Sequence, residues 1–147
     1  MPEFLEFRVD KFTFRVALDR HYTDEGVWAK SEKGLVRIGL SDFLQQRSGD
    51  VAFAELKPIG THVRRGDEVA VIETIKVNLS LASPVSGEIV EINPGMETGP
   101  EVINLDPYEE GWLATIESSD WKDDQTFLMD ASMYFEQTKR QAEDEVR

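Results

Sequence analysis

The sequence has 147 residues and no cysteine, which allows one domain with its own core but excludes disulfides, thiol nucleophiles and cysteine-metal sites. It carries 16 Lys and Arg against 29 Asp and Glu, a formal net charge of -13. Because this charge repels phosphate backbones and anionic lipid headgroups, we expect neither nucleic acid nor membranes as partners.

The amino-terminal residues alternate apolar and charged side chains, and they lack the apolar stretch and cleavage site of a signal peptide. No apolar run in the sequence is long enough to span a bilayer. We therefore expect a cytoplasmic protein. Period-two alternation continues through residues 4–18 and predicts one or two strands there.

A hairpin and a short helix are predicted next. Residues 27–40 contain two apolar segments around a polar turn at residues 31–34, which is typical of a hairpin. Ser41 can cap a helix that runs to about Arg47, because its hydroxyl can accept a hydrogen bond from a first-turn amide. We expect Gly49 to end that helix.

The middle of the chain, residues 49–105, predicts a series of short strands separated by Pro and Gly. We expect these strands at residues 51–56, 68–73, 76–82 and 87–92. Such dense turn spacing favours a sandwich or flattened barrel over a parallel sheet. The fold class predicted from these patterns is therefore mainly β.

The last segment changes to helical spacing. Apolar residues from Leu128 to Phe135 predict a C-terminal helix within residues 126–147, capped by Thr126 or Asp130. The three tryptophans are expected to be structural, since buried indoles contribute large apolar areas. The two histidines, His21 and His62, have no metal-ligand spacing, and no metal site is predicted.

The segment that indicates chemistry is a predicted hairpin around Lys76. Residues 72–77 form a strand end that contains Glu73 and a turn with one lysine at its tip, and Pro84 and Gly87 follow the returning strand. A lone lysine in a turn is ordinarily a solvated surface residue. The arrangement resembles the attachment hairpin of the lipoyl- and biotin-carrier superfamily, and that context favours a functional lysine.

The wider chain resembles the glycine-cleavage H-protein family within that superfamily. The similarity covers roughly residues 22–135, and its motifs occur in the family's order. The segments that carry it, besides the hairpin, are residues 37–43, 48–60, 93–113 and 128–134.

The resemblance implies a barrel-sandwich hybrid with lipoate joined covalently to Lys76 as a swinging arm. It implies a non-catalytic carrier with no catalytic residues of its own, in which Glu73 lies near the arm as a recognition residue and Gly87 serves the hairpin turn. It also implies a lipoate ligase or lipoyltransferase and a dihydrolipoamide dehydrogenase as partners. We expect a monomer with an extension at residues 1–20 and a lipoyl domain at 21–147.

The chain departs from the family near Lys76, and three functions stay open. The tip is Glu-Thr-Ile-Lys instead of Glu-Ser-Val-Lys, Ser80 stands where the family has an acid, and Gly26–Val27 replaces a His-Glu pair. Since such changes alter a surface that partners contact, we favour an H-like carrier that serves sulfur oxidation with a heterodisulfide-reductase-like complex. The alternatives are the glycine-cleavage carrier, which serves glycine decarboxylase and aminomethyltransferase, and an unmodified binding domain or lipoate-delivery intermediate.

Overall fold

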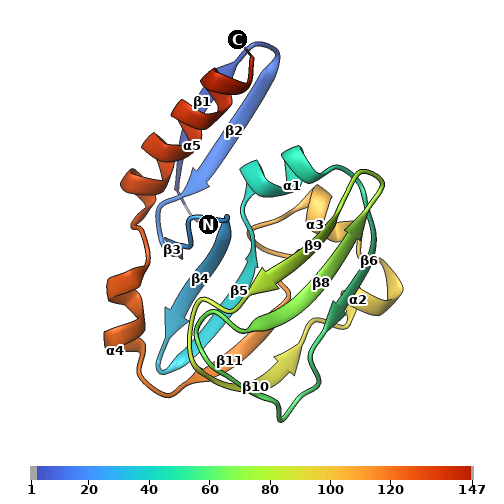
Figure 1. Ribbon diagram of the computed structural model, residues 1–147, viewed down its shortest axis with the longest axis vertical. Helices are drawn as coiled ribbons and strands as arrows, with labels where there is room; N and C mark the ends of the chain where they lie inside the picture. The colour runs from blue at the N-terminus through green and yellow to red at the C-terminus, as the bar shows by residue number, and fades with distance from the viewer. Residues whose placement is uncertain (1–2, 147) are drawn as a thin grey trace.

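The computed structural model describes residues 3–146 and contains three β-sheets (Figure 1). Six strands form the largest sheet in the order β3-β4-β5-β11-β10-β7, three form a second in the order β6-β8-β9, and β1-β2 is a separate hairpin. The strands are β1 (Phe4–Val9), β2 (Phe12–Ala17), β3 (His21–Tyr22), β4 (Val27–Glu32), β5 (Leu35–Leu40), β6 (Val51–Leu56), β7 (His62–Val63), β8 (Glu68–Thr74), β9 (Asn78–Ala82), β10 (Gly87–Ile92) and β11 (Ala114–Ser118). The helices are α1 (Asp42–Ser48), α2 (Gly95–Thr98), α3 (Val102–Leu105), α4 (Trp121–Asp124), the 3-10 turn η1 (Gln125–Phe127) and α5 (Ala131–Glu145).

The main core lies between the two larger sheets. Alternate side chains of a strand face opposite sides of its sheet, so the apolar set of each strand turns inward. Ile38, Ile72, Ile89 and Ile116 come from four different strands of both sheets and are fully buried in one cluster. The mainly β sandwich with one short helix after Ser41 and another helix at the C-terminal end confirms the predicted fold class.

The predicted hairpin at residues 27–40 is confirmed as β4 and β5, with a turn at Lys33–Gly34 that is shorter than expected. The short helix is also confirmed. The Ser41 hydroxyl oxygen accepts a hydrogen bond from a first-turn amide at 3.1 Å. Gly49 ends the helix with a φ of 89°, a left-handed value that favours glycine.

The N-terminal strands form the hairpin β1-β2, which packs on α5 instead of joining either larger sheet (Figure 1). Three aromatic rings form this contact: Phe7 lies 5.1 Å from Phe14 and 5.4 Å from Phe135, centroid to centroid. Phe43 from α1 packs against Phe14 at 5.2 Å. The extension therefore packs on both helices that flank it.

The last helix begins at Ala131, so Asp130 rather than Thr126 is its cap. Residues 125–127 form the η1 turn instead. Sequence patterns did not predict β3, β7, β11 or the one-turn helices. The strand β11 has three consecutive buried residues, Ala114 to Ile116, because the polar Thr115 is buried as well, and its five residues include one large apolar side chain, Ile116.

Candidate functional site

Lys76 lies in the turn that joins β8 and β9, at the tip of a hairpin of the three-stranded sheet. The turn is formed by residues 75–77, so β9 begins at Asn78 rather than at Lys76 as predicted. The Lys76 side chain is exposed, and within residues 3–146 no hydrogen bond or ion pair engages its amine. An exposed amine without a partner is accessible for amide formation.

The Thr74 hydroxyl organises this turn. Its oxygen accepts hydrogen bonds from the backbone N–H groups of Lys76 at 3.2 Å and Val77 at 3.0 Å. The hydroxyl proton faces two carbonyl oxygens, that of Ser48 at 2.7 Å and that of Val77 at 2.9 Å. The serine that is usual in the family has the same hydroxyl, so this change at the tip keeps the hydrogen-bonding group.

The hairpin tip also rests on the segment that follows α1. The Ile75 N–H donates to the Asp50 carbonyl at 3.0 Å. A Cβ on Gly49 would lie 3.4 Å from the Lys76 Cδ atom, which is an ordinary contact, so the φ of 89° rather than lack of space favours glycine here. The Asn104 amide nitrogen donates to the Gly49 carbonyl at 3.1 Å and holds this segment from the other side. Sequence reasoning missed Thr74, Gly49 and Asn104 as supports of the turn.

Glu73 lies on the outer face of the three-stranded sheet, three residues before Lys76. Its carboxylate is exposed and has no hydrogen bond or ion pair among the described residues. Its Cα pairs with Phe53 on one side and Asn78 on the other. The structure thus places an unpaired carboxylate beside the turn, while its recognition role remains a prediction.

Gly87 lies elsewhere than we expected. It is the first residue of β10, where it pairs with Val63 and Ser118, and it is not part of the turn that carries Lys76. A Cβ at this position would collide with the Glu117 carbonyl oxygen. The assignment of Gly87 to the hairpin turn is therefore wrong, because close approach of β11 is what requires glycine here.

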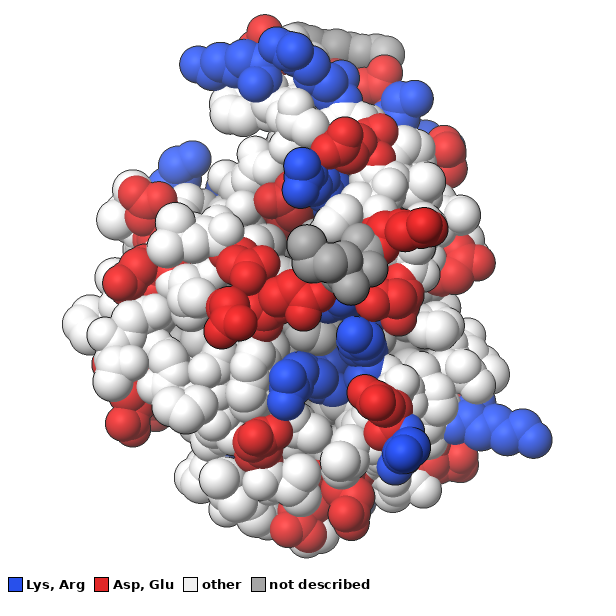
Figure 2. All heavy atoms as spheres, turned by 180° about the vertical axis from the view of Figure 1, so that it is seen from behind, with Lys and Arg blue, Asp and Glu red and all other residues white. Residues whose placement is uncertain are grey.

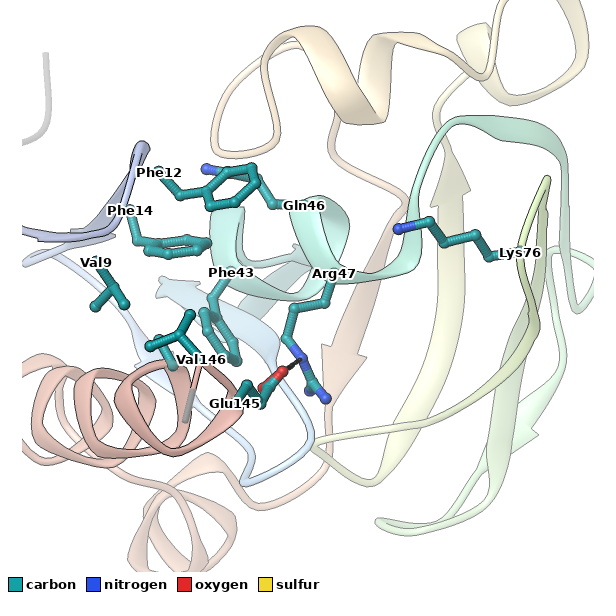
Figure 3. Close-up of a pocket in the computed structure, with 10 residues that line it drawn as sticks. Val9, Phe12, Phe14, Phe43, Gln46, Arg47, Lys76, Glu145 and Val146 are labelled. Atoms are coloured by element: carbon teal, nitrogen blue, oxygen red, sulfur yellow. Dashed lines mark hydrogen bonds and ion pairs between the residues drawn. The ribbon is translucent and has the colours of Figure 1, made fainter.

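A groove begins beside Lys76 and runs between α1, the N-terminal hairpin and the end of α5 (Figure 3). Its volume is about 320 Å³. Its apolar lining includes Val9, Phe12, Phe14, Phe43 and Ala142. Arg47 and Glu145 form an ion pair at its edge, with Nε and Oε1 at 3.0 Å. The lysine therefore has a largely apolar surface next to it.

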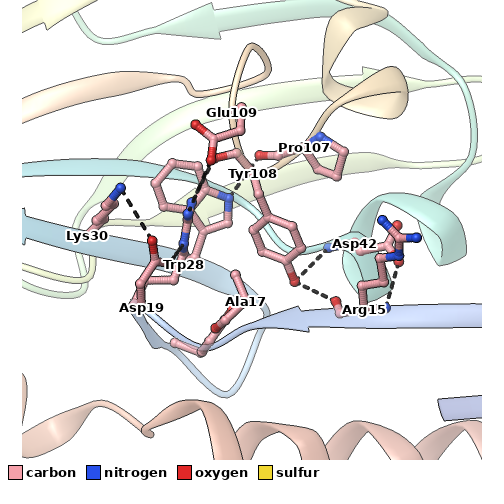
Figure 4. Close-up of polar contacts among 11 residues, drawn as sticks. Arg15, Ala17, Asp19, Trp28, Lys30, Asp42, Pro107, Tyr108 and Glu109 are labelled. Atoms are coloured by element: carbon pink, nitrogen blue, oxygen red, sulfur yellow. Dashed lines mark hydrogen bonds and ion pairs between the residues drawn. The ribbon is translucent and has the colours of Figure 1, made fainter. Parts of the chain in front are cut away.

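A buried polar cluster fixes the loop before Glu109 (Figure 4). The Arg20 guanidinium donates to the Tyr108 carbonyl at 2.7 Å, and the Trp28 indole donates to the Pro107 carbonyl at 3.0 Å. The Tyr108 hydroxyl donates to the Arg15 carbonyl at 2.7 Å, and burial raises the pKa of Tyr108 to about 12. The phenol therefore stays protonated at neutral pH and can donate this hydrogen bond, and Trp28 is buried as predicted.

The charge of the molecule is spread over its surface. Figure 2 shows acidic side chains across one face, with several Lys and Arg side chains at its upper end.

Among the described residues, no group of three or more His, Asp and Glu side chains is arranged to hold a metal ion. No helix within residues 3–146 is long and apolar enough to cross a membrane.

Comparisons with known proteins identify similar chains. The family described as glycine cleavage H-protein matches residues 20–141. The glycine cleavage system H protein of Anaeromyxobacter sp. (strain K) is 44% identical over 116 residues, which cover 79% of this chain and 90% of that protein. Its counterpart from Thermus thermophilus is 40% identical over 124 residues, covering 84% of this chain and 96% of that protein.

A solved structure shows the same architecture. The crystal structure of a glycine cleavage system H protein from Mycobacterium marinum aligns with a TM-score of 0.76 and 30% identity, covering 83% of this chain and 98% of that chain. Residues 4–18, which form the N-terminal hairpin, precede the matched family segment. The chain therefore belongs to the glycine cleavage H-protein family, whose members are non-catalytic carriers of a lipoyl group attached covalently to a lysine.

Proposed function

We propose that this chain carries its lipoyl group on Lys76 and presents it to partner enzymes. The observation that carries this proposal is an exposed amine at the tip of a hairpin that Thr74 and the segment after α1 hold in place. In the attachment step, the Lys76 nitrogen forms an amide bond with the activated carboxyl carbon of lipoate. The activating group leaves, and a proton passes to solvent.

The carrier role follows from tethering. When attached, the dithiolane supplies reversible disulfide-dithiol exchange. The chain has no cysteine, so no thiol of its own can form a competing mixed disulfide with the arm. A tether makes each delivery effectively intramolecular within a docked complex, which raises the local concentration of the reacting sulfur.

We further propose that the pathway is glycine cleavage, in which the arm carries an aminomethyl group. The relatives and the solved structure described above are named glycine cleavage H proteins, which supports this alternative better than the sulfur-oxidation interpretation that the sequence departures favoured. Its partners are a lipoate ligase or lipoyltransferase, glycine decarboxylase, aminomethyltransferase and dihydrolipoamide dehydrogenase. A heterodisulfide-reductase-like partner has no support in these comparisons.

Two of the sequence departures have structural explanations that do not involve a new partner. Ser80 donates a hydrogen bond to the Glu68 carboxylate, so an acid still lies beside that position. This hydrogen bond, together with the Lys57 ammonium at 3.2 Å, holds the pKa of Glu68 below its usual value.

Gly26 has a φ of 104°, and a Cβ there would lie 3.0 Å from the Tyr134 hydroxyl of α5. Its positive φ, together with packing against α5 and against the Leu44 Cβ of α1, which would lie 2.9 Å away, therefore accounts for Gly26.

Intact mass measurement tests the attachment site. We expect protein made in lipoate-supplied cells to gain one lipoyl mass on Lys76, and Lys76→Arg to gain none. Peptide mapping that finds the lipoyl group on another lysine would refute the assignment to Lys76. An unmodified wild-type protein would favour a binding domain without the cofactor.

Reconstitution tests the pathway. The lipoylated protein should support exchange between glycine and labelled bicarbonate with a glycine decarboxylase, and Lys76→Arg should not. If the lipoylated chain is reduced normally by dihydrolipoamide dehydrogenase but fails in the exchange reaction, the glycine-cleavage proposal is rejected. The cytoplasmic location and the monomeric state remain predictions.

A further inference from the structure

Phe53 is an aromatic side chain left open to solvent beside the proposed attachment site. It lies on β6 and is 67% exposed. Its Cα pairs with Glu73, three residues before Lys76. Directly opposite side chains on adjacent strands lie close together, so Phe53 and Glu73 occupy one outer patch near the hairpin tip.

A β-bulge is the reason that Phe53 faces outward. Val51 is buried and pairs with Thr74, yet Phe53 pairs with Glu73, so Ala52 is an extra residue in β6. In a regular strand, residues 51 and 53 would share the core face. The bulge places Phe53 on the outer face instead, so its ring forgoes the stabilisation that burial of a large apolar side chain provides. Bulges often redirect a side chain next to a functional site.

A shallow depression of about 590 Å³ adjoins Phe53, between β6 and α2. Its floor is apolar and includes Ile92 and the buried Met96. The charged residues of its lining are Glu55, Glu73 and Glu97. Within residues 3–146 none of these three carboxylates is in an ion pair, in contrast to Glu68, which is paired with Lys57. In the part of the chain that the structure describes, β6 pairs only with β8, so its other edge has no strand partner and lies beside α2.

We infer that Phe53, Glu55, Glu73 and Glu97, here named the Phe53 surface, dock the enzyme that attaches lipoate to Lys76. This inference rests on the proposed function. The partner surface it fits carries apolar side chains that cover Phe53 and enter the depression, with Lys or Arg opposite the three carboxylates. Aromatic anchors in a desolvated patch dominate many interfaces, and complementary rim charges accelerate and orient encounter.

The enzyme that attaches lipoate is the partner we assign to the Phe53 surface, because its reaction takes place at the lysine amine itself. It must bring the activated carboxyl carbon within about 3–3.5 Å of the amine nitrogen, and therefore must cover the surface around the hairpin tip. Enzymes that act on the finished carrier meet sulfur atoms at the far end of a long arm. They can dock farther from β6 and still reach their reacting group.

Kinetics of lipoylation test the inference. Purified unmodified protein is titrated into a lipoate ligase from its own cell with lipoate and ATP, and KM and kcat for the protein are measured. We expect Phe53→Ala to raise KM about tenfold, the equivalent of losing one interface anchor of about 1.4 kcal/mol, with kcat unchanged. Phe53→Trp should retain the wild-type KM.

Phe127→Ala is the matched control, because Phe127 is a phenylalanine of similar exposure, 62%, in η1, outside all three sheets. It should leave KM within twofold of the wild-type value. Melting temperatures of both variants monitor folding.

Combined Glu55→Gln and Glu73→Gln substitutions should raise KM and weaken its dependence on salt, whereas Glu143→Gln on α5 should not.

The outcomes separate the inference from the proposed function. If wild-type protein is lipoylated on Lys76 but Phe53→Ala has the wild-type KM, the docking surface is wrong, whatever the variant does with later enzymes. A fall in kcat alone, with KM unchanged, also overturns it, since docking acts on KM. If the wild-type protein gains no lipoyl group on Lys76, the proposed function itself fails.

Discussion

The Thr74 hydroxyl hydrogen-bonds three backbone groups of the turn at residues 75–77 and the Ser48 carbonyl. Thr74→Val keeps the shape of the side chain but removes all of these hydrogen bonds. We expect the free energy of unfolding to fall by about 1–3 kcal/mol. The backbone amide hydrogens of the turn should also exchange faster with solvent, and Lys76 should be lipoylated more slowly. Thermal denaturation, hydrogen exchange and initial lipoylation rates measure these effects.

Thr74→Ser is the control for the hydroxyl. It keeps the donor and acceptor while it removes the methyl group, so it should stay close to wild type in all three measurements. A valine variant that matches wild type in exchange and lipoylation would show that the hydroxyl does not organise the turn.

Gly87 is required by a neighbouring strand, and that requirement can be measured. Gly87→Ala places a Cβ against the Glu117 carbonyl of β11, and overpacking of this kind costs about 1–3 kcal/mol. Gly95→Ala is the matched control, since its Cβ would meet its nearest atom, Asn93 Oδ1, at 3.3 Å, and alanine favours a helix. Chemical denaturation should show a clear loss only for Gly87→Ala, and equal stabilities would contradict the close approach described here.

The position of the lysine could be predicted from sequence, whereas its supports could not. Lys76 is recognisable because a strand, a turn and a returning strand are local patterns. The contacts from Ser48, Asp50 and Asn104 join segments far apart in the chain, and no periodicity reports them. The outward direction of Phe53 was likewise hidden, since it depends on one extra residue in pairing between strands.

At the level of elements, the N-terminal hairpin and α5 depend on each other. Phe7 of β1 is 6% exposed and contacts the rings of Phe14 in β2 and Phe135 in α5. Phe7→Ala therefore removes apolar contacts that hold the hairpin against α5. Buried Phe→Ala changes cost about 3–5 kcal/mol. We expect faster hydrogen exchange in β1, β2 and α5, with the strands of the main sandwich still protected.

The half-exposed Phe12 provides the control for this prediction. It lies on the same hairpin and is 45% exposed, so Phe12→Ala should change exchange little. Uniform loss of protection throughout the molecule in Phe7→Ala would mean that the hairpin and the sandwich unfold as one unit.

Helices and strands could be predicted where the residues that determine them lie close together in the sequence. The hairpin β4-β5 and helix α1 were predicted because alternation, a turn and a capping serine lie within a few residues of each other. The strand β11 was missed because it has five residues and only one large apolar side chain, Ile116, which is too little to mark a strand in the sequence. The two-residue strands β3 and β7 are too short to give a pattern.

At the scale of the whole molecule, the net charge of -13 governs encounters with partners. A strongly charged surface attracts oppositely charged partner surfaces over about one Debye length, roughly 10 Å at 0.1 M salt. We expect the KM of dihydrolipoamide dehydrogenase for the lipoylated protein to rise severalfold between low and moderate salt. Free lipoamide, which is uncharged, is the control substrate. Equal salt dependence for both substrates would exclude electrostatic steering by this chain.

The chain of contacts from α5 to the lysine has a mechanical consequence. Tyr134 of α5 hydrogen-bonds Ser41 at 2.6 Å, Ser41 caps α1, and the end of α1 holds the Thr74 hydroxyl. These hydrogen bonds restrain the Lys76 backbone, so we expect an attached arm to move mainly by rotation about its own bonds. The end of the arm would then reach positions at about one distance from this restrained backbone, on the side that faces away from the protein. A confined search of this kind corresponds to effective concentrations on the order of millimolar, so the fold sets how often the sulfur meets a docked active site.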